Sequence, residues 1–360
     1  MGFRTIPLSG PGFGLLLVAA TLLLPGCAYL AKQASGHMKL MAGRVPLEEA
    51  LATVEFTDSE REVLEWVPRI KAFGESEVGL SETKNYTTIN PDFDDVVWNV
   101  SACAPDRFEA HRYHYPVVGV LPYIGFFDKE EAREEAQRLR ELGWETHVRP
   151  AGAYSTLGWF RDPLWRSMLK WDLERMANTV LHELAHASLW LKGEGRFNES
   201  FASFVGDRAT ELFLQVPGEG QEARWQEHLG SEADRAQYRA SMHLLVVRLE
   251  ALYAAGLSGD EVARRREAII QDARESHARK DWKTRGYARA MRPERQFNNA
   301  RLYQFRVYNT GMNDFDRALA RFGGDLRAFV EAARTRLPRE KRAGGRDWDP
   351  YEALRALAPQ

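Results

Sequence analysis

Residues 178–207 read NTVLHELAHASLWLKGEGRFNESFASFVGD and place two histidines and two glutamates in one short, otherwise apolar segment. The motif His-Glu-Leu-Ala-His at 182–186 has apolar neighbours on nearly every side, which predicts a buried α-helix. Histidines at i and i+4 lie about 40° apart around a helix, so the imidazoles of His182 and His186 can reach one ion. Glu183 lies about 100° further round, where it can reach a water on that ion but not readily the ion itself. The spacing predicts a zinc site of the metalloprotease type, with Glu183 as the general base.

Two ligands do not complete such a site, because a catalytic zinc needs three protein ligands and one open position. The glycines in Lys192–Phe197 predict a turn, and the apolar periodicity after Asn198 predicts a second helix. A helix hairpin of this kind brings Glu199 back toward the two histidines, so Glu199 is the predicted third ligand of one Zn²⁺ per chain. We expect Asn198 to cap the second helix and Asp207 to hydrogen-bond a ligand histidine.

The competing interpretation is a core helix whose histidines are satisfied by ordinary hydrogen bonds. Burying two stacked imidazoles and a carboxylate without an ion is costly, which favours the zinc site. The longer pattern H-E-x-x-H-x-x-G-x-x-H is excluded, because Leu189 and Lys192 stand where its glycine and third histidine would be.

The N-terminus carries a targeting signal rather than part of the fold. Arg4 precedes an apolar run at 13–24, which is too short for a comfortable transmembrane helix and fits a signal peptide. Leu24-Pro25-Gly26-Cys27 resembles a bacterial lipobox, and that resemblance implies cleavage before Cys27 and acylation of its thiol. An uncleaved anchor is the alternative. We expect residues 1–27 to be the signal peptide and 28–45 to be a tether or first amphipathic helix.

Composition and pattern indicate an α+β fold. The chain of 360 residues has a net charge of −2, which gives no electrostatic case for nucleic acid binding. Residues 46–160 read as a mixed part with a small sheet, and 161–360 as a mainly helical part that carries the zinc hairpin. The expected strands are 86–89, 96–100 and 144–148. The expected helices are 58–73, 129–142, 163–191 (beginning at an Asp162-Pro163 cap), 198–214, 221–254, 260–279, 297–306 and 325–335. If Cys27 carries lipid, Cys103 has no partner within the chain and is predicted to be a small buried side chain.

On these motifs the chain resembles the predicted zinc aminopeptidases of bacterial envelopes, which are gluzincin-like lipoproteins. The resemblance also covers residues 153–160, Asn298-Asn299-Ala300 with Tyr308 following, and 323–326. It implies zinc-dependent hydrolysis of peptide bonds near an amino terminus. Ala28 after the lipobox cysteine implies, by resemblance to Gram-negative lipoproteins, sorting to the periplasmic face of the outer membrane. Two features depart from better-understood gluzincins: the gap between His186 and Glu199 is shorter, and the Gly-x-Met-Glu-Asn amine-anchoring motif is missing.

The expected mechanism assigns further roles. Zinc lowers the pKa of its water, and Glu183 takes the proton and passes it to the leaving amine. Tyr308 is the candidate donor to the developing oxyanion, and Tyr154–Thr156 is a candidate edge strand beside the substrate. Asp162 and Glu194 are the candidates for binding the substrate's amine. Two alternatives stay open: a zinc endopeptidase of the envelope, and a non-enzymatic lipoprotein that uses a peptidase-like fold for binding.

Overall fold

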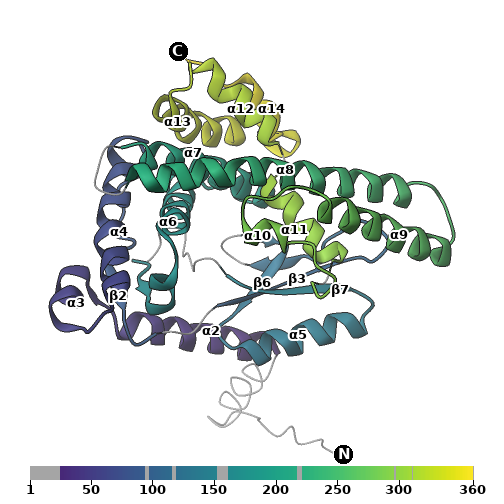
Figure 1. The fold of residues 1–360 in the computed structure, drawn as a ribbon, viewed down its shortest axis with the longest axis horizontal. Coiled ribbons are helices and arrows are strands. Elements are labelled where there is room, and N and C mark those ends of the chain that lie inside the picture. The colour runs from purple at the N-terminus through teal and green to yellow at the C-terminus, as the bar shows by residue number, and fades with distance from the viewer. Residues whose placement is uncertain are drawn as a thin grey trace, which may run out of the picture.

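The structure is a computed structural model that describes residues 25–93, 97–115, 119–151, 161–216, 221–295, 297–309 and 311–359. It is an α+β fold in which small sheets occupy the N-terminal half and helices make up the rest (Figure 1). The strands are β1 Val45–Pro46, β2 Thr88–Asn90, β3 Trp98–Cys103, β4 Tyr113–Tyr115, β5 Gly119–Leu121, β6 Tyr123–Phe126, β7 Glu145–Pro150 and β8 Leu164–Trp165. The helices before the α6–α7 hairpin, which spans residues 173–214, are α2 Pro25–Ala42, α3 Leu47–Thr53, α4 Asp58–Ser76, α5 Lys129–Glu141 and the 3₁₀ helix η1 Arg166–Lys170.

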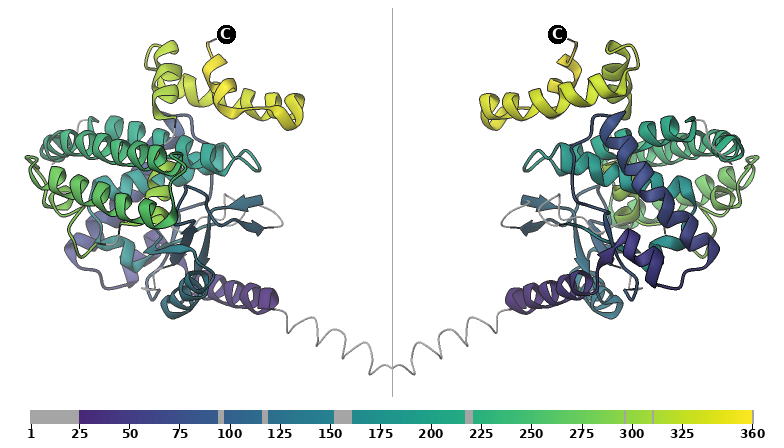
Figure 2. Two further views of the ribbon diagram at one scale, coloured as in Figure 1. Left: turned by 90° about the vertical axis from the view of Figure 1, so that its right-hand side faces the viewer. Right: turned by 90° about the vertical axis from the view of Figure 1, so that its left-hand side faces the viewer.

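The helices of the hairpin and beyond form most of the second half. They are α6 Leu173–Ser188, α7 Gly195–Leu214, α8 Gln221–Tyr253, α9 Gly259–Ala278, α10 Arg285–Ala288, α11 Asn299–Asn309, α12 Met312–Arg321, α13 Leu326–Gly344, the 3₁₀ helix η2 Gly345–Asp347, and α14 Pro350–Ala356. Helices α12 to α14 form a separate layer at the end of the molecule opposite to α2 and α5 (Figures 1 and 2).

The main sheet has the strand order β6-β3-β7, and both pairings are antiparallel. Its register places Val100 opposite Ile124 of β6 and Val148 of β7. Helix α5 packs on one side of this sheet and α11 on the other (Figure 1). The sheet therefore lies between helices, with β6 as one of its edges.

A single large core joins the N-terminal helices to the hairpin. Buried side chains of α4, such as Leu64 and Ile70, belong to the same apolar cluster as Leu181 of α6 and Phe201 of α7. The segment expected to be a tether or first helix is α2, and its end contributes Leu40, which is fully buried. The hairpin of α6 and α7 is thus held in place by apolar contacts from both halves of the chain.

The helices at 58–73, 129–142, 221–254 and 260–279 and the strand at 144–148 are confirmed to within a few residues. The Asp162-Pro163 helix start is wrong: Leu164 and Trp165 pair with β2 as β8, and the helix begins only after Asp172. Sheet pairing overrides the local cap signal there. Helices α12 and α14 were not predicted from the sequence.

No helix in the described part of the chain is long and apolar enough to cross a membrane. The apolar run at 13–24 lies outside the described residues, so the signal-peptide prediction is not tested by this observation. Cys27 lies in α2, but its side chain is outside the description.

Candidate metal centre

Helix α6 carries the two predicted histidine ligands. The Asp172 side chain caps it by accepting a 2.7 Å hydrogen bond from the Arg175 backbone N–H. The helix ends at Ser188, where the hydroxyl donates to the Leu184 carbonyl and accepts from the Ser81 backbone N–H. Apolar residues such as Leu181 and Leu184 are fully buried around it, as its sequence predicts.

The turn between α6 and α7 is fixed by Asn198. Its side-chain oxygen accepts from the Leu191 N–H and its amide donates to the Leu191 carbonyl, both at 2.9 Å. The expected cap role of Asn198 is wrong, because α7 already begins at Gly195 and Asn198 lies in its first turn. The side chain instead clamps the connection, which places the next residue, Glu199, on the face of α7 toward α6.

A glycine lets the two helices approach closely beside one ligand. Gly206 of α7 faces His182, and a Cβ added at Gly206 would lie 3.2 Å from the His182 Cβ and 3.3 Å from the Asn178 carbonyl oxygen. Any larger residue there would push the helices apart at the level of His182.

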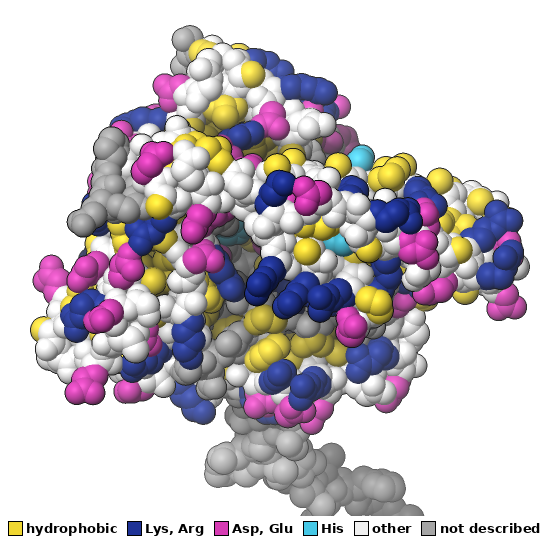
Figure 3. Space-filling view, in the orientation of Figure 1, with side chains coloured by type: hydrophobic (Ala, Val, Ile, Leu, Met, Phe, Trp, Pro, Cys, Tyr) yellow, Lys and Arg dark blue, Asp and Glu magenta, His cyan; other side chains and the backbone are white. Residues whose placement is uncertain are grey.

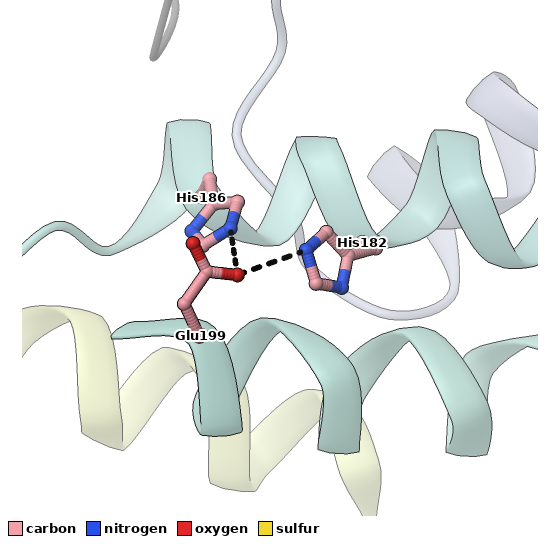
Figure 4. A group of neighbouring side chains, drawn as sticks. All are labelled: His182, His186 and Glu199. Carbon is pink, nitrogen blue, oxygen red and sulfur yellow. Dashed lines mark ion pairs between the residues drawn. The ribbon is translucent and has the colours of Figure 1, made fainter. Parts of the chain in front are cut away.

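The three predicted ligands converge. Oε2 of Glu199 lies 3.7 Å from Nε2 of His182 and 3.6 Å from Nε2 of His186 (Figure 4). The two imidazoles meet edge to face with centroids 4.7 Å apart. These residues form one of the two groups of potential ligands in the described part of the chain, with ligand atoms within 4.8 Å of one another.

This arrangement fits a metal ion better than it fits a hydrogen-bonded cluster. Both Nε2–Oε2 separations exceed the usual 2.7–3.2 Å of an N–H···O hydrogen bond. Two donors that each lie about 2.0–2.1 Å from a tetrahedral zinc are about 3.3–3.4 Å apart. Two imidazoles with one carboxylate are also a known ligand set of catalytic zinc. The residues present therefore fit the ion that the sequence predicts.

The electrostatics of the cluster favour a cation. Burial, aided by the neighbouring His186, lowers the pKa of His182 to about 4, so its ring is neutral at pH 7. Burial opposes ionisation of Glu199, but the two imidazoles and the Tyr123 hydroxyl outweigh it and hold the pKa of Glu199 at about 2. Burial also lowers the pKa of His186, yet the Glu199 carboxylate shifts it upward overall. The carboxylate thus attracts positive charge, and a proton on His186 would compete with a metal.

Glu183 lies outside the ligand group, as its place on the helix predicts. Glu183 is only 9% exposed, so it is buried, as His186 and Glu199 are. Burial raises the pKa of the Tyr86 hydroxyl, and the nearby negative charges of Glu183 and Asp162 raise it further.

Tyr86 itself is strained. It is the only non-glycine residue with positive φ in the described part of the chain, at 59°, and it is 1% exposed. Its hydroxyl has no hydrogen-bond partner among the described residues. Strained and unsatisfied groups of this kind concentrate at functional sites. The sequence predicts Tyr86 to begin a strand, whereas strand β2 begins only at Thr88.

Tyr123 is a second residue of the site that no sequence pattern predicts. Its hydroxyl, on β6, donates a 3.1 Å hydrogen bond to Oε1 of Glu199, the oxygen that does not face the histidines most closely. The contact spans the two halves of the chain, and no local pattern indicates it. Tyr123 therefore supports the carboxylate from the sheet side.

Asp207 lies close enough to His182 for its charge to affect the pKa of that residue. Its Oδ1 accepts a 2.9 Å hydrogen bond from Asn178, and its Oδ2 pairs with Arg239. The negative charge of Asp207 raises the pKa of His182, against the effect of burial, whereas the positive charge of Arg149 lowers it.

The other predicted site residues have mixed outcomes. Tyr308 lies in α11, which packs on α7 through a 2.9 Å hydrogen bond from Ser200 to the Val307 carbonyl, but its side chain is outside the description. Tyr154–Thr156 also lie outside the described residues. Asp162 is 1% exposed, whereas Glu194 forms an ion pair with Lys341 of α13. Glu194 is therefore not the uncompensated carboxylate that an amine anchor requires.

The predicted buried cysteine is confirmed. Cys103 is a free, fully buried thiol, and burial raises its pKa to about 12. It lies at the end of β3 and plays no part in the cluster.

The surface is hollowed below α8, and Lys and Arg side chains gather along that hollow (Figure 3). Arg149 of β7 hydrogen-bonds Gln304 of α11 at 2.8 Å, and its positive charge contributes to the lowered pKa of His182.

The α+β fold carries a helix hairpin that gathers two imidazoles and a carboxylate, with a further glutamate, Glu183, in the same buried region. The chain belongs to the family described as "Putative aminopeptidase", whose model matches residues 28–344. This membership supports a peptidase function at a coarse level. No curated protein and no solved structure matches the chain.

Proposed function

We propose that the protein is a zinc-dependent aminopeptidase of the bacterial cell envelope. The observation that carries the proposal is the convergence of His182, His186 and Glu199, with donor separations of 3.6 and 3.7 Å around one point. Family membership adds the coarse activity, and the intact Glu183 adds the base that peptide hydrolysis needs.

Each residue of the site has a chemical task. His182, His186 and Glu199 would hold the zinc ion, and when bound it would supply Lewis acidity for polarising a carbonyl group and activating water. Glu183 accepts the proton of the attacking water and delivers it to the leaving amine. Its buried position removes competing solvent and raises the strength of its electrostatic interactions.

A phenol is the proposed donor to the developing oxyanion. Tyr308 of α11 is our first candidate. Ser200, the residue after Glu199, donates a hydrogen bond to the carbonyl of Val307, which holds α11 against α7. Tyr86 is a second candidate, because it is buried near Glu183 and its hydroxyl has no hydrogen-bond partner in the described part of the chain. One well-placed donor contributes about 10²–10³-fold to the rate.

The decisive experiment measures zinc content and hydrolysis of a panel of aminoacyl reporters by the purified protein. We expect about one equivalent of zinc at this site and activity that chelation removes and zinc restores. Glu183→Gln should retain the zinc and the fold and lose about 10²–10⁴-fold in kcat. Near-normal turnover by Glu183→Gln would overturn the assignment of the base.

A non-enzymatic lipoprotein with the same fold is the rival from another class. It predicts full zinc loading with no hydrolysis of any reporter or peptide. Retention of Glu183 favours the enzyme, since a binding protein has no chemical need for that carboxylate beside the ligands.

We propose further that acylated Cys27 anchors the mature chain at the periplasmic face of the outer membrane. The support is the lipobox at 24–27 and the alanine that follows it. The mature protein should begin at Cys27 and sediment with membranes. A Cys27→Ser variant that stays full length and membrane-bound would instead favour an uncleaved anchor.

A further inference from the structure

A second group of metal-ligating side chains lies at the junction of α7 and α8. Glu211 comes from α7, and His228 and Glu232 come from α8, with one ligand atom of each within 4.8 Å of the others. His228 and Glu232 are spaced i, i+4, so they share one face of α8. The group has no residue in common with the His182–Glu199 site.

His228 has the surroundings of a ligand rather than of a surface histidine. It is 1% exposed and stacks on Trp225 with ring centroids 5.3 Å apart. Neither ring nitrogen has a well-aligned hydrogen bond among the described residues. Buried polar atoms are rarely left in this condition without a water or an ion.

The carboxylate of Glu174 lies beside the imidazole of His228. Oε1 of Glu174, in the first turn of α6, lies 3.1 Å from Nδ1 of His228, which is an ion-pair distance although the contact is poorly aligned as a hydrogen bond. Metal-bound histidines commonly give one ring N–H to a carboxylate, which orients the ring and leaves the other nitrogen for the metal. Glu174 can act in this way on His228.

Two arginines hold the flanking carboxylates. Arg208 pairs with Glu211 at 2.9 Å, and Arg235 pairs with Glu232 at 3.1 Å and also with Glu174. These contacts fix the carboxylates and offset part of their charge, but they leave the cluster acidic enough to attract a cation. The other candidate cation is a proton, because Glu174, despite burial, raises the pKa of His228.

We propose that Glu211, His228 and Glu232 bind a second divalent transition-metal ion, with zinc as the matching chemistry, and that Glu174 positions His228. Imidazole with carboxylates suits Zn²⁺ rather than Ca²⁺ or Mg²⁺, which prefer oxygen ligands alone. The ion joins α7 to α8 and has a structural role outside the reaction.

The test is a zinc titration of the full chain in a His182→Ala background, which separates this site from the catalytic one. We expect wild type to bind two equivalents, His182→Ala one, and His182→Ala/His228→Ala none. Added zinc should raise the Tm of His182→Ala but not that of the double variant. Glu174→Gln should raise the Kd of the second ion about 10–100-fold.

Two variants and one control keep the result interpretable. Glu211→Gln and Glu232→Gln remove ligand charge without creating a cavity, and each should weaken the second ion while leaving the circular dichroism unchanged. His243→Ala removes an exposed histidine of the same helix and should change nothing. If His182→Ala binds no zinc, or if zinc affinity in that background is unchanged by His228→Ala or by Glu232→Gln, the second site is refuted. The catalytic proposal fails separately, by His182→Ala binding as much zinc as wild type.

Discussion

The hydroxyl of Tyr123 and Oε1 of Glu199 are 3.1 Å apart, and the other oxygen of the same carboxylate faces both histidines. The two oxygens of Glu199 therefore have different partners, one on the sheet and one on α6. A carboxylate held in this way presents a single oxygen to an ion in a fixed direction. The edge strand β6 thus takes part in building a site whose ligands all come from helices.

Tyr123→Phe is expected to raise the Kd for zinc at the catalytic site about 10–100-fold, because it removes the hydrogen bond that orients the third ligand. Zinc competition with a chelator of known affinity measures the change. The hydroxyl of Tyr113, on β4, contacts Glu135 of α5 at 3.4 Å, so Tyr113→Phe is the matched control and should bind zinc normally. Equal zinc affinity in both variants would show that Tyr123 does not support the ligand.

Asn198→Ala is expected to destabilise the hairpin by about 2–3 kcal/mol, because two buried backbone groups of Leu191 lose their partners. Denaturant unfolding of the metal-free protein measures this loss. Gln215→Ala, which removes one exposed hydrogen bond on the same helix, should change stability by less than about 0.5 kcal/mol. A similar loss of stability in both variants would show that the two hydrogen bonds of Asn198 do not stabilise the hairpin more than an exposed hydrogen bond does.

Gly206→Ala is expected to weaken zinc binding by about tenfold, because its Cβ forces His182 to move by a few tenths of an ångström. The control is Gly230→Ala on α8, where no atom lies within 4 Å of the added Cβ. That change should stabilise the fold by about 0.5–1 kcal/mol and leave zinc affinity unchanged. Normal zinc affinity in Gly206→Ala would show that the two helices have room to adjust.

His147 on β7 is expected to make the fold sensitive to mild acid. Burial, with Arg301 and Arg149 nearby, lowers its pKa to about 4 in the folded protein, against 6.5 for the ordinary side chain. The unfolded chain therefore takes up a proton first, so stability is complete above about pH 6.5 and falls as the pH approaches 4. The contribution is at most about 3 kcal/mol.

The measurement compares unfolding free energies at pH 7 and pH 4.5 in the presence of a chelator. His147→Gln should lose less stability on acidification than wild type does, whereas His243→Gln, at an exposed position, should behave as wild type. If His147→Gln and wild type show the same acid dependence, another group controls it.

The sequence determines the hairpin because its information is local. Two histidines one turn apart, a glycine-rich turn and a glutamate at hairpin distance are close in the chain, so helix geometry alone brings them together. Tyr86 and Tyr123 could not be predicted in this way. Tyr123 reaches Glu199 through the pairing of β3 with β6, and the N–H of Tyr86 bonds the carbonyl of Asp162, a residue far away in the sequence. The same reason explains the wrong helix start at Asp162, where a long-range strand pairing decides the local structure.

The last prediction concerns which end of a peptide is recognised. An aminopeptidase must bind a free α-ammonium group through a carboxylate. Of the two candidates, Glu194 forms an ion pair with Lys341, and Asp162 is buried at 1% exposure, so we take Asp162 as the predicted anchor. N-acetylation of a peptide substrate should lower kcat/KM by about a hundredfold or more, the loss expected when a charge-assisted contact is not made. Asp162→Asn should lower kcat/KM for free peptides toward the value for acetylated ones, and Glu194→Gln should not. Equal cleavage of blocked and free peptides would instead identify an endopeptidase, with the same zinc ligands and the same base.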